Sequence, residues 1–129
     1  MDNPYRARVA DQRFLNLPGF HGGAYIRAYV EDTSARDFDA AKDHVPDPRL
    51  VLEISDCYNC IALEFDVSSP AQRMNSFHKI DSLVGALEAF RAGMAGEAAI
   101  YRRRCRAIEA HRADSEGGAK RSSQLSSAA

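Results

Sequence analysis

Long apolar segments are missing from this sequence of 129 residues. No stretch approaches the roughly 18 uncharged apolar residues of a membrane span, so we expect no association with a membrane. An excess of one charge is missing as well, because 17 basic and 18 acidic side chains leave a net charge of −1. Bulk charge therefore gives no case for a uniformly basic, histone-like protein.

Paired cysteines are also missing, as is an apolar run in the first residues. The three cysteines are an odd number without a disulfide framework, and the segment Met1–Arg6 lacks the apolar run of a secretory signal. Both features favour a reducing compartment. We therefore predict a cytoplasmic protein.

Catalytic motifs are the third absence. The sequence contains no P-loop, no dinucleotide-binding fingerprint and no H-E-x-x-H helix. His21, Gly22 and Gly23 are typical of the oxyanion loop of esterases, but no G-x-S-x-G elbow supplies a nucleophilic serine. The expectation is a protein that is not an enzyme and has no small-molecule substrate.

Three segments alternate between apolar and polar residues, which is the pattern of strands with one buried face. They are Ala24–Glu31, Leu50–Ser55 and Ile61–Val67, with a hairpin tip at Ser55–Cys60 between the last two. We therefore predict a three-stranded antiparallel sheet. Residues 1–12 show no sustained period and are expected to form a flexible arm.

The acidic connection at residues 31–49 carries one helix signal. Ser34 and Asp37 have the spacing of a capping box, which predicts a short helix over Ala35–Asp43. Pro46 and Pro48 are expected to end this helix, because proline has no backbone N–H donor and favours extended geometry in the residue before it.

A long C-terminal helix is the other main element. Ser69, Pro70 and Gln72 supply a hydroxyl cap, a proline at the first helical position and a glutamine at the third. Apolar residues then recur every three or four positions, which predicts a helix over about 70–111. The Ser-, Gly- and Ala-rich residues 113–129 are expected to be a disordered tail. The fold class is thus α+β, a single domain over residues 13–112.

The predicted helix is too long for the predicted sheet. It spans roughly 60 Å, whereas a seven-residue strand spans about 23 Å, so the sheet covers only its first half. Two arrangements protect the second half: Gly93 and Gly96 break the helix and it folds back, or it pairs with another chain. The residues expected to bind a partner are Met94, Ala98, Tyr101, Cys105 and Ile108.

The second arrangement, pairing with another chain, has two supports in the sequence. Five apolar residues recur at the seven-residue spacing of coiled coils. They are Ile80, Leu87, Met94, Tyr101 and Ile108. Small residues in the same region let two helix backbones approach closely. They are Ala92, Gly93, Ala95, Gly96, Ala98 and Ala99. The leading hypothesis is a non-enzymatic interaction protein that associates with itself or with another protein.

A dense cluster of arginines lies in the same half of the helix. Its members are Arg102, Arg103, Arg104 and Arg106, followed by Arg112. On a helical wheel they surround three sides of the apolar residues, whereas a nucleic-acid-binding helix usually presents its cations on one side. A solvated helix end is one interpretation, since arginine favours the negative C-terminal dipole. Nucleic-acid binding through phosphate contacts is the alternative function.

One pair of cysteines has chelating spacing. Cys57 and Cys60 lie on the predicted hairpin tip, where zinc knuckles occur, and antiparallel pairing brings His21 close to that tip. A small zinc-binding module is the third hypothesis, and no other cofactor is indicated. Cysteines that act as small apolar fillers are the competing interpretation.

Charge is distributed unevenly along the chain. Residues 1–67 hold 12 acidic and 7 basic side chains, a net charge of −5, while residues 68–129 hold 6 acidic and 10 basic, a net charge of +4. The near-neutral total therefore hides an arginine-rich helix end that can attract an acidic partner.

Three stretches resemble small uncharacterised proteins of actinobacterial phages and prophages. They are Arg13–Gly19, Leu50–Phe65 and Asn75–Asp81, and the likeness spans Arg13–Arg106. The resemblance implies a context and no activity. A small phage-derived protein in the host cytoplasm is expected to bind a host or phage component.

Overall fold

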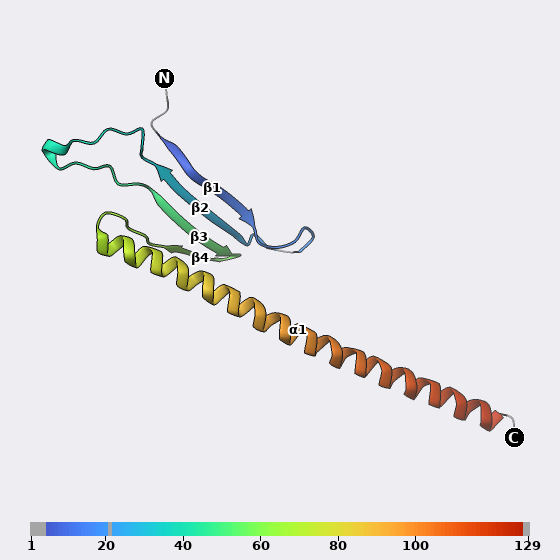
Figure 1. The fold of residues 1–129 in the computed structure, drawn as a ribbon. Coiled ribbons are helices and arrows are strands. Elements are labelled where there is room, and N and C mark those ends of the chain that lie inside the picture. The colour runs from blue at the N-terminus through green and yellow to red at the C-terminus, as the bar shows by residue number, and fades with distance from the viewer. Residues whose placement is uncertain (1–4, 21, 128–129) are drawn as a thin grey trace. The chain divides into compact units, whose positions relative to one another are not determined.

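The computed structural model describes residues 5–20 and 22–127. The fold is α+β: an antiparallel sheet of four strands in the order β1-β2-β3-β4, followed by one long helix (Figure 1). The elements are β1 (Arg6–Phe14), β2 (Tyr25–Asp32), the 3-10 turn η1 (Ala40–Lys42), β3 (Leu50–Asp56), β4 (Asn59–Leu63) and α1 (Pro70–Ser127).

The chain divides into two compact units. The sheet unit, Met1–Ile80, holds the four strands and the first turns of α1, and the helix unit, Asp81–Ala129, holds the rest of α1. The sequence predicts a single domain over residues 13–112. The structure differs because only the first turns of α1 belong to the sheet unit, and the rest of this helix forms a unit by itself.

Strand β1 differs from the prediction, because the sequence indicates a flexible arm over residues 1–12. It pairs antiparallel with β2 along its whole length. Apart from half-buried Asp11, its residues are exposed. The register places Arg6, Asp11 and Arg13 on the same side of the sheet as Ala28 and Val30, and inward-pointing charges of this kind are common on edge strands. A strand of this kind lacks the alternation of apolar and polar residues by which strands are recognised in a sequence.

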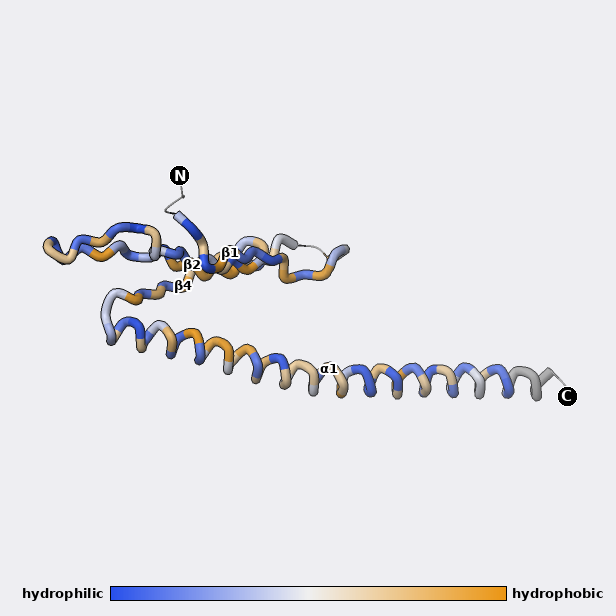
Figure 2. The backbone as a smooth tube through the Cα atoms, turned by 45° about the horizontal axis from the view of Figure 1, so that its top comes forward, coloured by the Kyte–Doolittle hydropathy of each residue, from blue (hydrophilic) through white to orange (hydrophobic). Residues whose placement is uncertain are grey.

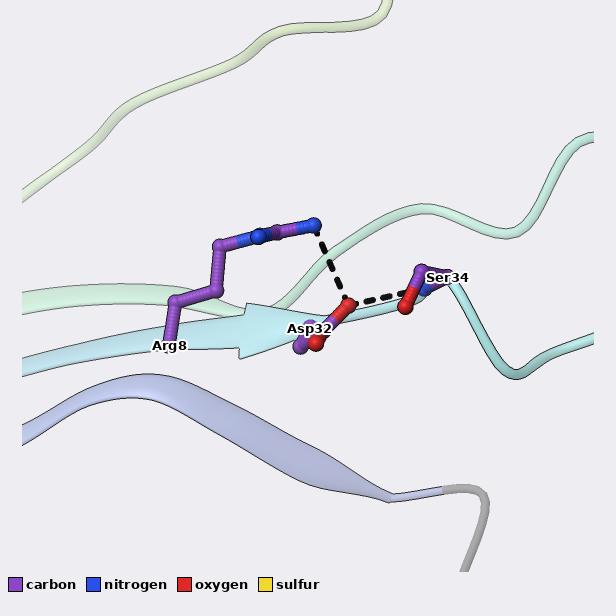
Figure 3. A network of polar contacts seen from close by, with 3 residues as sticks. All are labelled: Arg8, Asp32 and Ser34. Carbon is purple, nitrogen blue, oxygen red and sulfur yellow. Dashed lines mark hydrogen bonds and ion pairs between the residues drawn. The ribbon is translucent and has the colours of Figure 1, made fainter.

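A bulge in β1 sets which of its side chains face the apolar side. The register shifts between Ala7 and Val9, so that Val9 pairs with Val30 and Arg8 is the extra residue. Arg8 Nη2 contacts Asp32 Oδ1 at 3.1 Å, and the Ser34 amide donates to the same oxygen at 2.9 Å (Figure 3). The hydrogen bonds from Ser34 lower the pKa of Asp32 below its ordinary value, and the positive charge of Arg8 lowers it further.

The three predicted strands are confirmed as β2, β3 and β4, and their antiparallel pairing is confirmed as well. The register gathers apolar side chains on one face of the sheet. These residues, the apolar face, are Ile26, Ala28, Val30, Leu50, Leu52, Ile54, Ile61 and Leu63. Of them, Ile61 is exposed and the others are only half-buried. Within the described residues, the buried apolar side chains are the small ones of Ala24 and Pro46.

Strand β4 ends at Leu63, four residues before the predicted end at Val67. Side chains from the first turns of α1 pair with the backbone of the segment after Leu63. Lys79 Nζ donates to the Glu64 carbonyl at 2.6 Å, and the Ser76 hydroxyl exchanges two hydrogen bonds with the Asp66 backbone at 2.8 and 2.9 Å. These helix side chains replace a neighbouring strand as hydrogen-bond partners.

The predicted short helix is reduced to the single 3-10 turn η1. Its cap is Asp39, whose carboxylate accepts from the Ala41 and Lys42 amides at 3.1 and 3.3 Å. The predicted cap, Ser34, instead donates its amide to Asp32. A capping-box spacing marks a helix only where the following residues also wind into one.

The predicted start of α1 is confirmed. Pro70 is the first helical residue, and Ser69 Oγ accepts from the Gln72 amide at 3.1 Å. The helix is continuous through Gly93 and Gly96, so the fold-back arrangement is wrong, and it runs to Ser127, so the predicted end near 111 and the disordered tail are wrong too. No proline follows Pro70 in the sequence, and glycine weakens a helix without ending it.

Candidate functional site

The residues predicted to bind a partner form one stripe on the helix unit. This apolar stripe consists of Met94, Ala98, Tyr101, Cys105 and Ile108, spaced four, three, four and three residues apart along α1. Residues with this spacing lie along one side of an α-helix. The largest of them are open to solvent, with 56%, 73% and 52% of Met94, Tyr101 and Ile108 exposed. Figure 2 shows hydrophobic and hydrophilic residues alternating along this part of α1.

Leaving the stripe uncovered is energetically unfavourable. Full burial of a large apolar side chain contributes about 1.5–3 kcal/mol. Helices in proteins also take most of their stability from packing an apolar face rather than from intrinsic propensity. The helix unit contains glycines at five positions, Gly85, Gly93, Gly96, Gly117 and Gly118. Each weakens a helix by about 1 kcal/mol relative to alanine, so this helix depends on packing for its stability. The exposed stripe is the surface that a partner would cover.

The arginine cluster, Arg102, Arg103, Arg104 and Arg106, surrounds the stripe. All four side chains are exposed, and none forms an ion pair with another residue of the described chain. At 100° per residue, Arg102 and Arg106 lie within about 40° of each other, whereas Arg104 lies about 160° from both. The cluster therefore does not form the single cationic face of a nucleic-acid-binding helix.

The cysteine pair lies on a tight hairpin between β3 and β4. Cys57 and Tyr58 form its two-residue turn, and Cys57 has a φ of 57°, which is uncommon for a residue with a side chain. The start of β2 does lie beside this tip, since a Cβ on Gly22 would stand 3.0 Å from Cys57 Sγ. His21, the third candidate zinc ligand, lies outside the described residues.

The zinc hypothesis receives no support from the geometry. Among the residues that the structure describes, no group of three His, Cys, Asp or Glu side chains is arranged to hold a metal ion. Cys57 and Cys60 are free thiols, both exposed, and Cys105 is a half-buried free thiol. Two thiolates without further ligands do not complete a tetrahedral zinc site.

A polar pair on the other face of the sheet was missed from the sequence. The Tyr25 hydroxyl donates to Glu53 Oε1 at 2.5 Å. This hydrogen bond, together with partial burial and the charge of Glu53, raises the pKa of Tyr25 to about 12. The alternation places both residues on the outward side of their strands, but only the register, which pairs Tyr25 with Ser55, brings them together.

A groove on the sheet unit was also missed. About 340 Å³ of space lies along the apolar face, lined almost entirely by apolar groups. Val30, Leu50 and Leu52 line it from the strands, and Phe77 and Ile80 from the first turns of α1. The sheet unit thus leaves part of its apolar face unfilled. A sequence pattern identifies which residues are apolar and does not indicate how closely they pack.

No described helix is both long enough and apolar enough to cross a membrane. No protein-family model, no curated protein and no solved structure matches this chain.

Proposed function

We propose that this chain is a non-enzymatic interaction protein that associates through the C-terminal half of α1. The observation that carries the proposal is the apolar stripe, which runs along a continuous helix with its large side chains half or more exposed. Isolated apolar residues on a surface are common, but a row that repeats at heptad spacing is typical of helices that pair.

The sheet unit supports the same interpretation. A domain that is complete by itself buries large apolar side chains, yet none of the described large side chains is fully buried. Chains with small cores commonly gain stability from a partner. In the phage context that the sequence resemblance implies, the partner is a second copy or a protein of the host or phage.

Substitution of the stripe tests the proposal. Tyr101→Asp combined with Ile108→Asp places two charges at the centre of the contact, and the variant is expected to elute as a monomer in size-exclusion chromatography with light scattering. The wild-type chain is expected to elute as an oligomer at micromolar concentration. Far-ultraviolet circular dichroism should show that the variant keeps its strands and loses helix.

The matched control introduces the same two charges on the opposite side of the helix. Ala89 and Ala110 are exposed, and each lies outside the heptad rows that contain the stripe. Ala89→Asp with Ala110→Asp should leave the oligomer intact. Equal association of wild type, stripe variant and control would show that the interface lies elsewhere.

Nucleic-acid binding is the second candidate function. It is favoured by the exposure of all four arginines of the arginine cluster and by the lack of ion pairs to them within the described chain. A pair of helices would also bring two such clusters together, which strengthens attraction to phosphates.

A further inference from the structure

We infer that the apolar stripe binds a second copy of this chain as a parallel, in-register coiled coil, with the arginine cluster setting the orientation. This inference rests on the proposed function and identifies the partner. It is drawn from the heptad positions of the charged residues on α1, which lie directly beside the stripe.

The stripe fixes the heptad assignment. In a heptad written a to g, positions a and d form the seam and positions e and g flank it. The stripe places Met94, Tyr101 and Ile108 at d, and Ala98 and Cys105 at a. The seam continues toward the sheet unit with Val84 at a and Leu87 at d.

Charges at the flanking positions match in a parallel pair. There, each g residue faces the e residue that lies five positions further along the partner. Three successive g residues are Glu97, Arg104 and His111, and the corresponding e residues are Arg102, Glu109 and Glu116. Every facing pair therefore combines an acidic residue with a basic or protonatable one. By symmetry each pair occurs twice in the dimer.

These charges are available for pairing between chains. None of the six residues forms an ion pair within the described chain, and all six side chains are exposed. Residues five apart on one helix do not face each other, so Glu97 and Arg102 cannot satisfy each other within a chain. In an antiparallel pair, g residues face g residues of the partner and e residues face e residues. The opposite charges at g and e would then not face each other, so the charge pattern favours the parallel pair.

Two further arginines limit the seam. Arg91 and Arg112 occupy a positions on either side of the stripe. A polar residue at a weakens a coiled coil and fixes its register, because any shift that buries such a residue against apolar side chains is unfavourable. The tight part of the contact is therefore confined to the two heptads between them, and the dimer should be of moderate affinity.

The four residues of the arginine cluster then fall into two pairs with different roles. Arg102 and Arg104 occupy e and g positions and pair with the partner, whereas Arg103 and Arg106 occupy the outer positions f and b. The first two are expected to determine orientation, and the other two remain in solvent. This division explains why the four arginines do not share one face of the helix.

Disulfide trapping tests the orientation directly. Helix axes 8–10 Å apart and a Cα radius of about 2.3 Å leave roughly 3.4–5.4 Å between the Cα atoms of facing a residues, which overlaps the Cα–Cα range of a disulfide. In a Cys57→Ser, Cys60→Ser chain, mild oxidation should join Cys105 to its own copy. Moving the thiol to Ala98, with Cys105→Ser, should give the same result. An antiparallel pair has one centre and cannot bring both positions to their own copies.

The control places the single cysteine at Ala110, an exposed f position, where little cross-linking is expected. A chain that is dimeric by light scattering but cross-links at neither seam position, or at only one, would refute the parallel arrangement while leaving the proposed function intact. A chain that is monomeric at high micromolar concentration would refute both.

Charge exchange provides a second test that needs no oxidation. Arg102→Glu should weaken dimerisation roughly tenfold, because two attractive pairs become repulsive in each dimer. Adding Glu97→Arg should restore most of the affinity, since the facing charges are again opposite. Arg103→Glu makes the same change of charge at an outer position and should have little effect. Equal loss in all three variants, or no rescue, would overturn the assignment.

Discussion

Replacing two glycines of α1 by alanine distinguishes the heptad seam from a contact made by small residues. Gly93 and Gly96 fall at positions c and f of the heptads defined by the stripe, away from the seam. Apart from the adjoining residues and the backbone of the same helical turns, a Cβ added at either would meet no atom within 4 Å. Alanine should therefore fit at both positions without displacing a neighbour.

The expected gain follows from helix propensity. Each exchange of glycine for alanine inside a helix contributes about 1 kcal/mol, so the double variant should gain about 2 kcal/mol for each chain. With a denaturant slope near 2 kcal/mol per molar urea, the midpoint of unfolding should rise by about 1 M. Circular dichroism at several protein concentrations measures both the midpoint and its dependence on association.

The control uses a glycine whose backbone requires it. Gly19 has a φ of 91°, where alanine is strained, so Gly19→Ala should lower stability even though nothing lies within 4 Å of its Cβ position. If the Gly93→Ala, Gly96→Ala variant instead lost stability or dimerised more weakly, the small residues would lie in the interface. The assignment of the seam to the apolar stripe would then be wrong.

Two further predictions concern other parts of the chain. Because the pKa of Tyr25 is raised from 10.0 to about 12, folding favours the neutral phenol. That contribution to stability is complete below about pH 10 and is lost as the pH rises toward 12. Absorbance titration of tyrosinate should show a late step that Tyr25→Phe removes and Glu53→Gln moves toward 10; a late step that persists in Tyr25→Phe would contradict the assignment. For the nucleic-acid alternative, replacing Arg102, Arg103, Arg104 and Arg106 by Gln should abolish any salt-sensitive binding to duplex DNA or RNA in a fluorescence anisotropy assay, and binding that survives would place the contact elsewhere.

The elements with strong periodicity were predictable from the sequence. Strands β2 and β3 alternate cleanly, and three agreeing signals mark the start of α1 at Pro70. In each case one local rule, either burial of one strand face or capping of a helix end, determines the structure. The apolar stripe was predictable for the same reason, because its spacing alone defines a helix face.

The elements that were missed depend on partners distant in the sequence. Strand β1 has no apolar face of its own and is defined by its pairing with β2. The hydrogen bond between Tyr25 and Glu53 exists only in the observed strand register. The helical extension to Ser127 was missed because its Ser-, Gly- and Ala-rich composition is also common in disordered tails.

The oligomeric state of the unmodified 129-residue chain decides whether the apolar stripe pairs with a second copy. Sedimentation equilibrium over a range from low to high micromolar concentration measures the mass without any substitution. We expect a concentration-dependent dimer with twice the chain mass of 14.2 kDa. A mass of 14.2 kDa throughout that range would contradict it.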